Sequence, residues 1–314
     1  MTRTKVAVLR GGPSEEYEIS MQTGRGVLEA LLKKNLDPID VVINKQGAWI
    51  VHGFERAPES ILSVIDVVFI ALHGTYGEDG TVQRLLDRHG VPYTGSRAYP
   101  SSVALNKLLT KEQLRNVGIK MAPHLKIRRE GTNIARAAMT IESLFGPEYV
   151  VKPINSGSSI GTRMAQGGAE LIRVLKEALR DREEVMVEER IKGREATVGI
   201  VERFRDHDFY RLPAIEIIPP PKADYFSADV KYTGETEELC PGRFSREEKS
   251  ALEEAAYLVH KNLELSQYSR SDFIVSPRGV YFLEVNTLPG LTATSLVPKA
   301  LQAVGCSYED FVWH

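Results

Sequence analysis

The length, composition and charge of the chain are those of an ordinary globular protein. With 314 residues it exceeds the roughly 100–200 residues usual for one domain, which predicts two or three subdomains. Its 42% hydrophobic and 26% charged residues exclude a disordered or fibrous protein. The 40 basic and 42 acidic residues leave a formal net charge of -2, so neither nucleic acid nor an anionic membrane is expected as a partner.

Membrane insertion and disulfide bonding are not expected either. The apolar run within residues 1–9 is too short for a signal peptide, and the longest run elsewhere, residues 67–72, is too short to cross a bilayer. The two cysteines, Cys240 and Cys306, show neither a disulfide framework nor the spacing of metal ligands. We therefore expect a protein of the reducing cytoplasm.

The first third of the chain alternates strand and helix signals. Strands are expected at residues 6–9, 39–43 and 67–72, and helices around residues 27–32 and 81–88. This alternation predicts a doubly wound α/β unit, in which ligands bind beyond the carboxyl ends of the strands. A helix expected over residues 102–117 and stopped by Gly118 opens the next section.

The rest of the chain predicts two α+β lobes. In the middle third we expect strands at residues 149–152, 162–165 and 184–188, a loop of small residues at 155–161 and a helix at 169–179. In the last third we expect two strands, a helix and a hairpin at residues 196–201, 212–218, 246–262 and 268–286. The mostly polar stretch from 219 to 242 is long enough to be a functional lid or a disordered segment.

Four polar residues of the expected hairpin form the most informative pattern: Arg270, Asp272, Glu284 and Asn286. Residues two apart in a strand share a face, so Arg270 lies with Asp272, and Glu284 with Asn286. If residues 277–279 form a three-residue loop that ends in a left-handed glycine, Asp272 lies opposite Glu284. Two carboxylates and an amide oxygen then converge, and a cation would relieve the repulsion. Oxygen ligands favour Mg²⁺ or Mn²⁺ bound together with a substrate phosphate.

The alternative interpretation of this pattern is a solvated strand face on which Arg270 forms a simple salt bridge. The Thr-Leu-Pro-Gly turn at residues 287–290 follows the strand directly, which is unusual for a strand in solvent. The combination of carboxylates, amide and turn therefore favours the metal site.

The small-residue loop at residues 157–161 (Gly-Ser-Ser-Ile-Gly) matches the G-x-S-x-G nucleophile elbow of α/β-hydrolases, with Ser158 as the nucleophile. The elbow requires a helix after the turn, whereas residues 162–165 indicate a strand. A strand–loop–strand of small residues is typical of a flap whose backbone N–H groups cover phosphates, and Lys152 adds positive charge beside it. A purely structural glycine-rich hairpin is the third interpretation. The P-loop motif G-x-x-x-x-G-K-[ST] does not occur.

Three further segments have both a structural and a functional interpretation. Glu16 follows the glycines after the first strand, and His73 opens the loop after residues 67–72. A helix start with acidic residues and a structural histidine would explain them, but a position at the carboxyl ends of strands favours a site. The charged residues 188–195 can form a solvated strand edge with a tight turn.

The order of these motifs resembles that of the D-alanine–D-alanine ligases of the ATP-grasp superfamily, over almost the whole chain. The resemblance rests on Gly11-Gly12-Pro13-Ser14 with Glu16 and Ser20, His73-Gly74 with Gly77-Glu78-Asp79-Gly80, Pro92-Tyr93-Thr94-Gly95-Ser96, Asn106-Lys107, Val151-Lys152-Pro153, residues 157–161, residues 188–195, Lys231-Tyr232, Arg270-Ser271-Asp272, Glu284-Val285-Asn286 with residues 287–290, and Ser295-Leu296-Val297-Pro298.

The resemblance implies an ATP-grasp fold of three subdomains, in which two α+β lobes clamp ATP. They would be an N-terminal Rossmann-like unit (1–98), a central lobe (99–189) and a C-terminal lobe (190–314) with a lid loop at 219–242. It implies a homodimeric ligase that joins two D-alanines through a D-alanyl phosphate, for peptidoglycan precursor synthesis. The charge transferred with the phosphate has to be neutralised by lysines and magnesium, and a closed lid has to keep water from the acyl phosphate.

The resemblance also implies residue roles. ATP would be bound by Lys107, Lys152, Glu188, Ile191, Glu195 and Lys231. Two Mg²⁺ or Mn²⁺ ions would be bound by Asp272, Glu284 and Asn286. Glu16 would bind the ammonium of the first D-alanine and connect through Ser158 to Tyr232. Arg270 and the backbone N–H of Gly290 would stabilise the tetrahedral intermediate. His73 and Ser295 would contact substrate, the serine at the carboxylate of the second D-alanine.

Two departures from the family bear on specificity. Arg190 stands where the family often has an aromatic residue beside the adenine, and the lid reads Phe-Ser-Ala-Asp-Val-Lys-Tyr over residues 226–232, without the usual Tyr-Asp-Tyr. The retained Lys231 and Tyr232 favour a dipeptide over a depsipeptide product, while D-serine or D-lactate stays open as the second substrate. From other classes, a serine hydrolase using Ser158 and a nucleotide-binding regulator without turnover are the alternatives.

Overall fold

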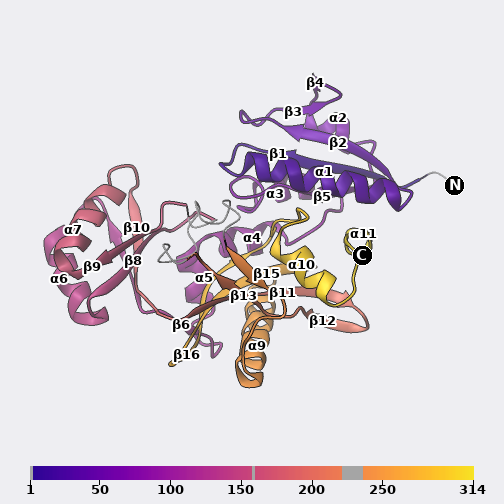
Figure 1. Ribbon diagram of the computed structural model, residues 1–314. Helices are drawn as coiled ribbons and strands as arrows, with labels where there is room; N and C mark the ends of the chain where they lie inside the picture. Colours follow the sequence, from indigo (N-terminus) through magenta and orange to yellow (C-terminus); the bar gives the residue numbers. More distant parts are fainter. Residues whose placement is uncertain (1–2, 158–159, 221–235) are drawn as a thin grey trace.

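The computed structural model describes residues 3–157, 160–220 and 236–314 of the chain (Figure 1). Three sheets organise these residues: five strands near the N-terminus, four in the middle of the chain, and a larger sheet formed mainly by the last third. In Figure 1 the first sheet lies at the top, the second at the left and the third at the centre and bottom. The predicted succession of one α/β unit and two α+β lobes is confirmed.

The first sheet has β1 near its centre. Its strands in spatial order are β4 (Phe54–Glu55), β3 (Trp49–Val51), β2 (Asp37–Ile43), β1 (Lys5–Gly11) and β5 (Val67–Ile70). β1 runs parallel to both β2 and β5, and residues 6–9 are at most 4% exposed, which explains their unbroken apolar run. The chain therefore leaves the carboxyl ends of β1 and β5 side by side, where open α/β sheets bind ligands.

The loop after β1 depends on a glycine. Gly11 has a φ of 88°, and a Cβ atom there would lie 2.4 Å from the backbone oxygen of Ile43, so that only glycine fits. The chain then enters α1 (Tyr17–Lys33), and the same unit contains α2 (Pro58–Leu62) and α3 (Thr81–Arg88).

The single helix predicted over residues 102–117 is wrong: two helices, α4 (Ala98–Leu105) and α5 (Lys107–Gln113), meet at Asn106. The backbone of Asn106 is extended, and its side-chain oxygen accepts hydrogen bonds from the N–H groups of Leu108 and Leu109. Such a cap provides partners for N–H groups that the first turn of a helix leaves open. Asn106 thus begins a second helix and places Lys107 in its first turn.

The central lobe has its own hydrophobic core. Its antiparallel sheet contains, in order, β7 (His124–Arg128), β10 (Glu184–Glu189), β8 (Glu148–Pro153) and β9 (Arg163–Gln166). Helix α7 (Gly167–Ala178) packs on β8 and β9, and α6 (Ile134–Phe145) packs on α7. The side chains of Ile141, Val151 and Leu171 are fully buried between these elements.

The third sheet carries the predicted hairpin. Its strands in order are β14 (Glu237–Leu239), β13 (Ile215–Ile218), β11 (Arg194–Phe204), β15 (Tyr268–Ser276), β16 (Gly279–Asn286) and β6 (Lys120–Met121), with β12 (His207–Arg211) paired to β11. Helix α9 (Arg246–Asn262) matches the predicted bounds and begins with a capping box between Ser245 and Glu248.

Two elements of the third sheet come from unexpected segments. β6 lies within residues 99–189, which the sequence assigned to the central lobe, but it pairs with β16 of the third sheet. The subdomain boundaries inferred from the sequence stay predictions. β14 lies inside the stretch 219–242 that we expected to be a lid loop, and it pairs with β13 because Glu216, Ile217 and Ile218 offer it a free strand edge. Of the remainder of this stretch, residues 221–235 lie outside the described residues.

The first and last thirds of the chain share one core. Helices α10 (Leu296–Ala303) and α11 (Tyr308–Trp313) join the buried cluster of the first sheet, and Lys33 of α1 forms an ion pair with Glu309 of α11 at 2.7 Å. A second cluster packs α9 against the third sheet, and the central lobe has a third cluster of its own. Across the described ranges, no helix is both long enough and apolar enough to cross a bilayer.

Candidate functional site

The predicted pair of facing carboxylates is present in the hairpin. Asp272 of β15 lies opposite Glu284 of β16, and Arg270 lies opposite Asn286. Asp272 accepts hydrogen bonds from three different residues. Arg270 donates to both of its oxygens at 3.0 Å, and Asn286 donates to Oδ2 at 3.3 Å. Thr197 of β11 donates to Oδ1 at 2.5 Å, so a neighbouring strand also orients this carboxylate.

The length predicted for the turn that sets this register is wrong, although Gly279 has the expected positive φ, at 116°. Ser276 pairs with Gly279, so the loop contains two residues, 277 and 278, rather than three. The register shifts by one residue just beyond Asp272, where Leu283 is the extra residue of a β-bulge. The bulge compensates for the shorter loop, and the two carboxylates still face each other. The prediction was right about the pair because two deviations cancel.

Glu284 is paired with a lysine of α5. Its Oε2 lies 3.0 Å from Nζ of Lys107, which also donates to the backbone oxygen of Ser156 in the small-residue loop. From the sequence we expected a bound cation to relieve the repulsion between the carboxylates. In the structure, the guanidinium of Arg270 and the ammonium of Lys107 already neutralise them.

The donor atoms at the hairpin fit Mg²⁺ or Mn²⁺ accompanied by phosphate. No group of three or more His, Cys, Asp or Glu side chains lies together as metal ligands in the part of the chain that the structure describes. The predicted ligands are instead a smaller set: the carboxylates of Asp272 and Glu284 and the amide oxygen of Asn286. Mg²⁺ usually takes only one or two protein carboxylates and completes its shell with water and substrate phosphates. The set suits an ion that arrives with a nucleotide.

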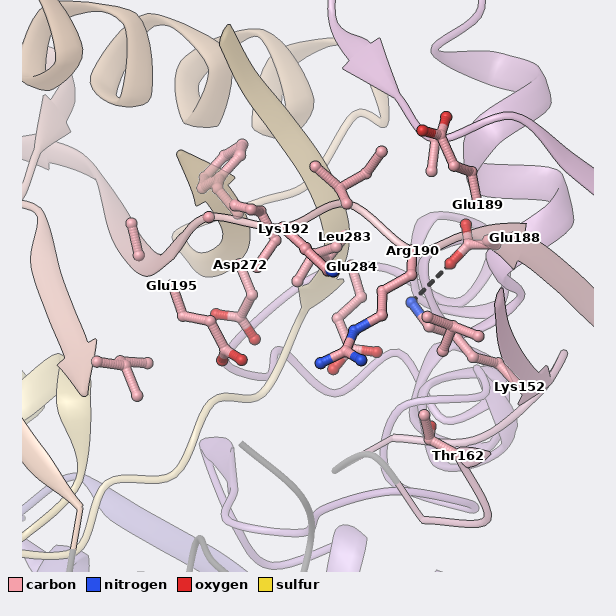
Figure 2. Close-up of a pocket in the computed structure, with 18 of the residues that line it drawn as sticks. Lys152, Thr162, Glu188, Glu189, Arg190, Lys192, Glu195, Asp272, Leu283 and Glu284 are labelled. Atoms are coloured by element: carbon pink, nitrogen blue, oxygen red, sulfur yellow. Dashed lines mark ion pairs between the residues drawn. The ribbon is translucent and has the colours of Figure 1, made fainter. Parts of the chain in front are cut away.

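A pocket between the central lobe and the third sheet contains most of the predicted nucleotide ligands (Figure 2). Among the residues that line it are Val150, Lys152, Met164 and Glu188 of the central lobe, Arg190, Ile191, Lys192 and Gly193 of the connection, and Glu195, Asp272, Leu283 and Glu284 of the third sheet. The structure thus brings Lys152, Glu188, Ile191, Glu195 and two of the predicted metal ligands to one cavity. Leu283, which the bulge adds to its wall, was not predicted.

Glu188 is held by two lysines. Its Oε1 lies 2.6 Å from Nζ of Lys111 on α5, and its Oε2 lies 2.7 Å from Nζ of Lys152 on β8. Burial disfavours the ionised carboxylate, but the two ammonium groups outweigh it and hold the pKa of Glu188 at about 2. Glu188 is therefore a permanent acceptor at neutral pH. Lys111 was not predicted, because nothing in a lone lysine of a helix indicates its partner.

Glu16 lies where β1, β5 and the small-residue loop meet. A Cβ atom added to Gly74 would lie 2.9 Å from Oε2 of Glu16, and one added to Gly157 would lie 3.6 Å from it. The hydroxyl of Ser14 donates to the backbone oxygen of His73 and fastens the two strand-end loops to each other. The missing side chains of Gly74 and Gly157 thus let both loops approach the predicted carboxylate closely.

His73 uses both of its ring nitrogens inside the protein. Nδ1 lies 2.9 Å from the backbone oxygen of Leu288, which can only accept, so Nδ1 carries the proton. Nε2 then accepts from the hydroxyl of Thr23 at 2.9 Å. Burial lowers the pKa of His73, although the nearby Glu16 opposes this, and the ring is neutral. In this structure His73 joins the first sheet to the turn after β16, and its predicted contact with substrate stays a prediction.

Glu78 is a buried carboxylate of the loop after β5, and the sequence did not indicate it as a site residue. It accepts hydrogen bonds from the backbone N–H groups of Gly74 at 2.9 Å and of Thr287 and Leu288 at 3.2 Å. Burial, reinforced by the charge of Glu16, raises its pKa to about 7. A second, small cavity is lined by Glu78, Lys107, Gly157, Glu284 and Asn286, so Glu78 lies next to the predicted phosphate site.

Gly290 and Ser295 lie together after this turn. A Cβ atom added to Gly290 would lie 2.9 Å from Oγ of Ser295, which itself accepts from the backbone N–H of Thr292 at 3.0 Å. Ser295 precedes helix α10. The two residues with predicted roles at the intermediate and at the second substrate are therefore neighbours.

Three predicted residues, Ser158, Lys231 and Tyr232, lie outside the described residues. The strands that flank the small-residue loop are described: β8 and β9 form an antiparallel hairpin around it. A nucleophile elbow requires a helix directly after its serine. The strand–loop–strand interpretation is confirmed, and the topology of a serine hydrolase elbow is absent from residues 148–157 and 160–166.

Comparison with known proteins agrees with this arrangement. Two family models match the chain, "D-ala D-ala ligase N-terminus" over residues 5–64 and 52–96 and "D-ala D-ala ligase C-terminus" over residues 113–314. A D-alanine–D-alanine ligase from Geobacter sulfurreducens is 39% identical over 312 residues, which cover 98% of this chain and 92% of that protein.

Two solved structures share the fold. The D-Ala:D-Ser ligase of Enterococcus faecalis superimposes with a TM-score of 0.85 at 27% identity, covering 99% of this chain and 98% of that one. The Bacillus anthracis D-alanine–D-alanine ligase complexed with ATP gives 0.79 at 30% identity, covering 98% and 94%. The predicted ATP-grasp fold is confirmed, and the chain belongs to the D-alanine–D-alanine ligase family.

Proposed function

We propose that this chain uses ATP to join two D-alanines into D-alanyl-D-alanine, with a D-alanyl phosphate as intermediate and ADP and phosphate as further products. The observation that carries the proposal is the pocket of Figure 2, in which the Lys152–Glu188 pair of one lobe faces Asp272 and Glu284 of the other. Basic and oxygen-donor groups on opposite walls suit a nucleotide whose phosphates carry a divalent cation.

The first step transfers a phosphoryl group. The carboxylate of one D-alanine attacks the γ-phosphorus of ATP, the bond to the bridging oxygen breaks, and ADP leaves. Lys107 and Lys152 lie at the two cavities and would hold the phosphates, while Asp272, Glu284 and Asn286 would hold Mg²⁺ or Mn²⁺. The ion would offset the charge of the phosphate oxygens. Lys107 and Arg270 would then exchange their present carboxylate partners for phosphate or intermediate.

The second step forms the peptide bond. The free amine of the second D-alanine attacks the acyl carbon. The bond from that carbon to the phosphate oxygen then breaks, and the departing phosphate takes up the proton that the amine loses. Glu16, beside Gly74 and Gly157, would bind the ammonium of the first D-alanine. Arg270 and the N–H of Gly290 would stabilise the oxyanion, and the neighbouring Ser295 would bind the second carboxylate. Predicted partners of Glu16 across the small-residue loop are Ser158 and Tyr232.

The direct test is incubation with ATP, Mg²⁺ and D-alanine, with phosphate and dipeptide measured together. Phosphate release that requires both ATP and D-alanine, in equal amounts with dipeptide, supports the proposal. Phosphate release without D-alanine, or no turnover, contradicts it. D-serine and D-lactate as second substrates test the alternatives, of which D-serine has a structural relative. A homodimer and a cytoplasmic location belong to the same proposal, and light scattering tests the former.

A further inference from the structure

Lys111 is a charged residue of α5 that the proposed chemistry leaves without a role. Its side chain is 1% exposed, and it does not line the pocket in which Lys152 and Glu188 lie. Its Nζ lies 2.6 Å from Oε1 of Glu188, which does line that pocket. Its ammonium therefore has no access to a nucleotide, and any influence on one has to pass through Glu188.

Charge balance does not account for Lys111. Lys152 alone would neutralise Glu188, since its Nζ lies 2.7 Å from Oε2. Figure 2 shows this ion pair at the wall of the pocket. A second ammonium buried beside a single carboxylate carries a large desolvation penalty. The proposed function gives a reason for the second lysine: it assigns Lys152 to the ATP phosphates, so Lys152 would turn from Glu188 to the ligand. Lys111 then keeps Glu188 paired while Lys152 engages a ligand.

The pocket wall around Glu188 selects for a particular kind of ligand edge. Ala122, Val150, Met164 and Ile191 contribute apolar surface, so a flat heterocycle would be held mainly by burial. An ionised carboxylate only accepts hydrogen bonds, and its two oxygens have about four lone-pair sites. Oε1 forms an ion pair with Lys111 but has no hydrogen-bond partner among the described residues, so the carboxylate keeps free acceptor sites. A 6-aminopurine presents an N–H donor to such a group. A 6-oxopurine presents an oxygen, which an acceptor-only group repels.

We propose that Lys111 is a positioning residue that sets nucleobase specificity: by pairing with Oε1 of Glu188 it keeps this carboxylate ionised and oriented, so that the pocket prefers a 6-aminopurine to a 6-oxopurine. The inference rests on the proposed function, which places ATP in this pocket. It goes beyond that function because it assigns the choice of base to a residue that never touches the nucleotide.

The probe pair is ATP and inosine triphosphate, which differ at the 6-position and in the proton on N1. Binding of each is measured by calorimetry without D-alanine, and kcat/KM of each with D-alanine. In the wild-type protein ATP is expected to be preferred. In Lys111→Met the preference for ATP falls by about tenfold or more, because a buried hydrogen-bonding group is left mispaired. The loss appears in Kd and KM rather than kcat, as expected for a contact made equally in the ground and transition states.

Three variants separate positioning from a general structural effect. Thr110→Val changes the neighbouring buried residue of α5, whose hydroxyl bonds to the backbone oxygen of Val103, and is expected to leave the ATP preference unchanged. Lys111→Arg keeps the charge and is expected to retain at least part of the preference for ATP that Lys111→Met loses. In a Glu188→Gln background, Lys111→Met changes the preference less than about twofold, because the group it acts through is gone.

An unchanged ATP preference in Lys111→Met, or the same loss with and without Glu188, overturns the proposal. If Lys111→Met does not fold, Lys111→Gln takes its place, since it keeps a polar group but no charge. If the wild-type protein binds ATP in preference to inosine triphosphate but makes no dipeptide, the proposed function is contradicted. The calorimetric comparison of wild type and Lys111→Met then still tests the role of Lys111. A wild-type protein that makes dipeptide equally well with both nucleotides contradicts only the inference.

Discussion

The carboxylate of Glu78 accepts a hydrogen bond at 3.2 Å from the backbone N–H of Leu288, a residue 210 positions further along the chain. Glu78 belongs to the loop after β5, and Leu288 to the turn after β16 that leads to Gly290. His73 bonds to the backbone oxygen of the same leucine. One residue of the turn is thus held by both its N–H and its carbonyl, which fixes the backbone that carries the predicted oxyanion donor.

Replacement of Glu78 by glutamine should change how stability depends on pH. The pKa of Glu78 is raised from 4.5 to about 7 by burial, so folding takes up a proton between these values. The free energy of unfolding of the wild type should therefore fall as pH rises through this window, by up to about 3 kcal/mol, and the Glu78 contribution should be constant above it. Urea unfolding at pH 5 and pH 8 measures the effect. The same change in the free energy of unfolding between these pH values in the wild type and in Glu78→Gln would contradict the prediction.

Asn106→Ala should reduce both stability and activity. It removes the cap of α5, with an expected loss of about 0.5–2 kcal/mol, and it loosens the turn that presents Lys107 to Glu284. Asn133 is the matched control, because its side chain caps α6 in the same way, far from the pocket. Asn133→Ala should lower stability by a similar amount with kcat/KM unchanged. Equal activity losses in the two variants would show that the cap has no local role.

Thr197→Val should weaken the use of divalent metal. The variant removes the 2.5 Å hydrogen bond that orients Asp272, and the Mg²⁺ concentration for half-maximal turnover should rise by about 10- to 100-fold. Ser271 is next to Asp272 in sequence but on the other face of β15, and Ser271→Ala serves as the control. This variant should leave the Mg²⁺ concentration for half-maximal turnover unchanged. Chelation with EDTA should stop turnover, and Mg²⁺ or Mn²⁺ should restore it. Full activity in EDTA would refute the metal site.

Lys231→Ala tests the predicted lid. The variant should lower kcat on the order of 100-fold, because a charge near the transferred phosphate is lost, with the thermal midpoint unchanged. Lys222→Ala lies in the same stretch and has no predicted role, so it should retain activity. Unchanged turnover in Lys231→Ala would refute the lid assignment.

Local rules account for the correct predictions in the hairpin. The alternation of faces along a strand grouped Arg270 with Asp272 and Glu284 with Asn286 without any knowledge of the partner strands. The same rules missed the bulge at Leu283, because a bulge is a property of the pairing between two strands, and the residues of one strand do not show it. They also missed the helix break at Asn106, since asparagine is compatible with both a helix interior and a cap.

By itself the sequence determined the class of fold, the order of its units and the chemical character of the site, because periodicity, turn residues and motif order are local properties of the chain. The tertiary structure decided which charges meet. Lys111 with Glu188, Lys107 with Glu284, and Glu78 with Leu288 join residues far apart in sequence, and their contacts exist only once separate helices and sheets have packed. Such pairs depend on distances of a few ångströms set by burial of the surrounding cores, which no local pattern encodes.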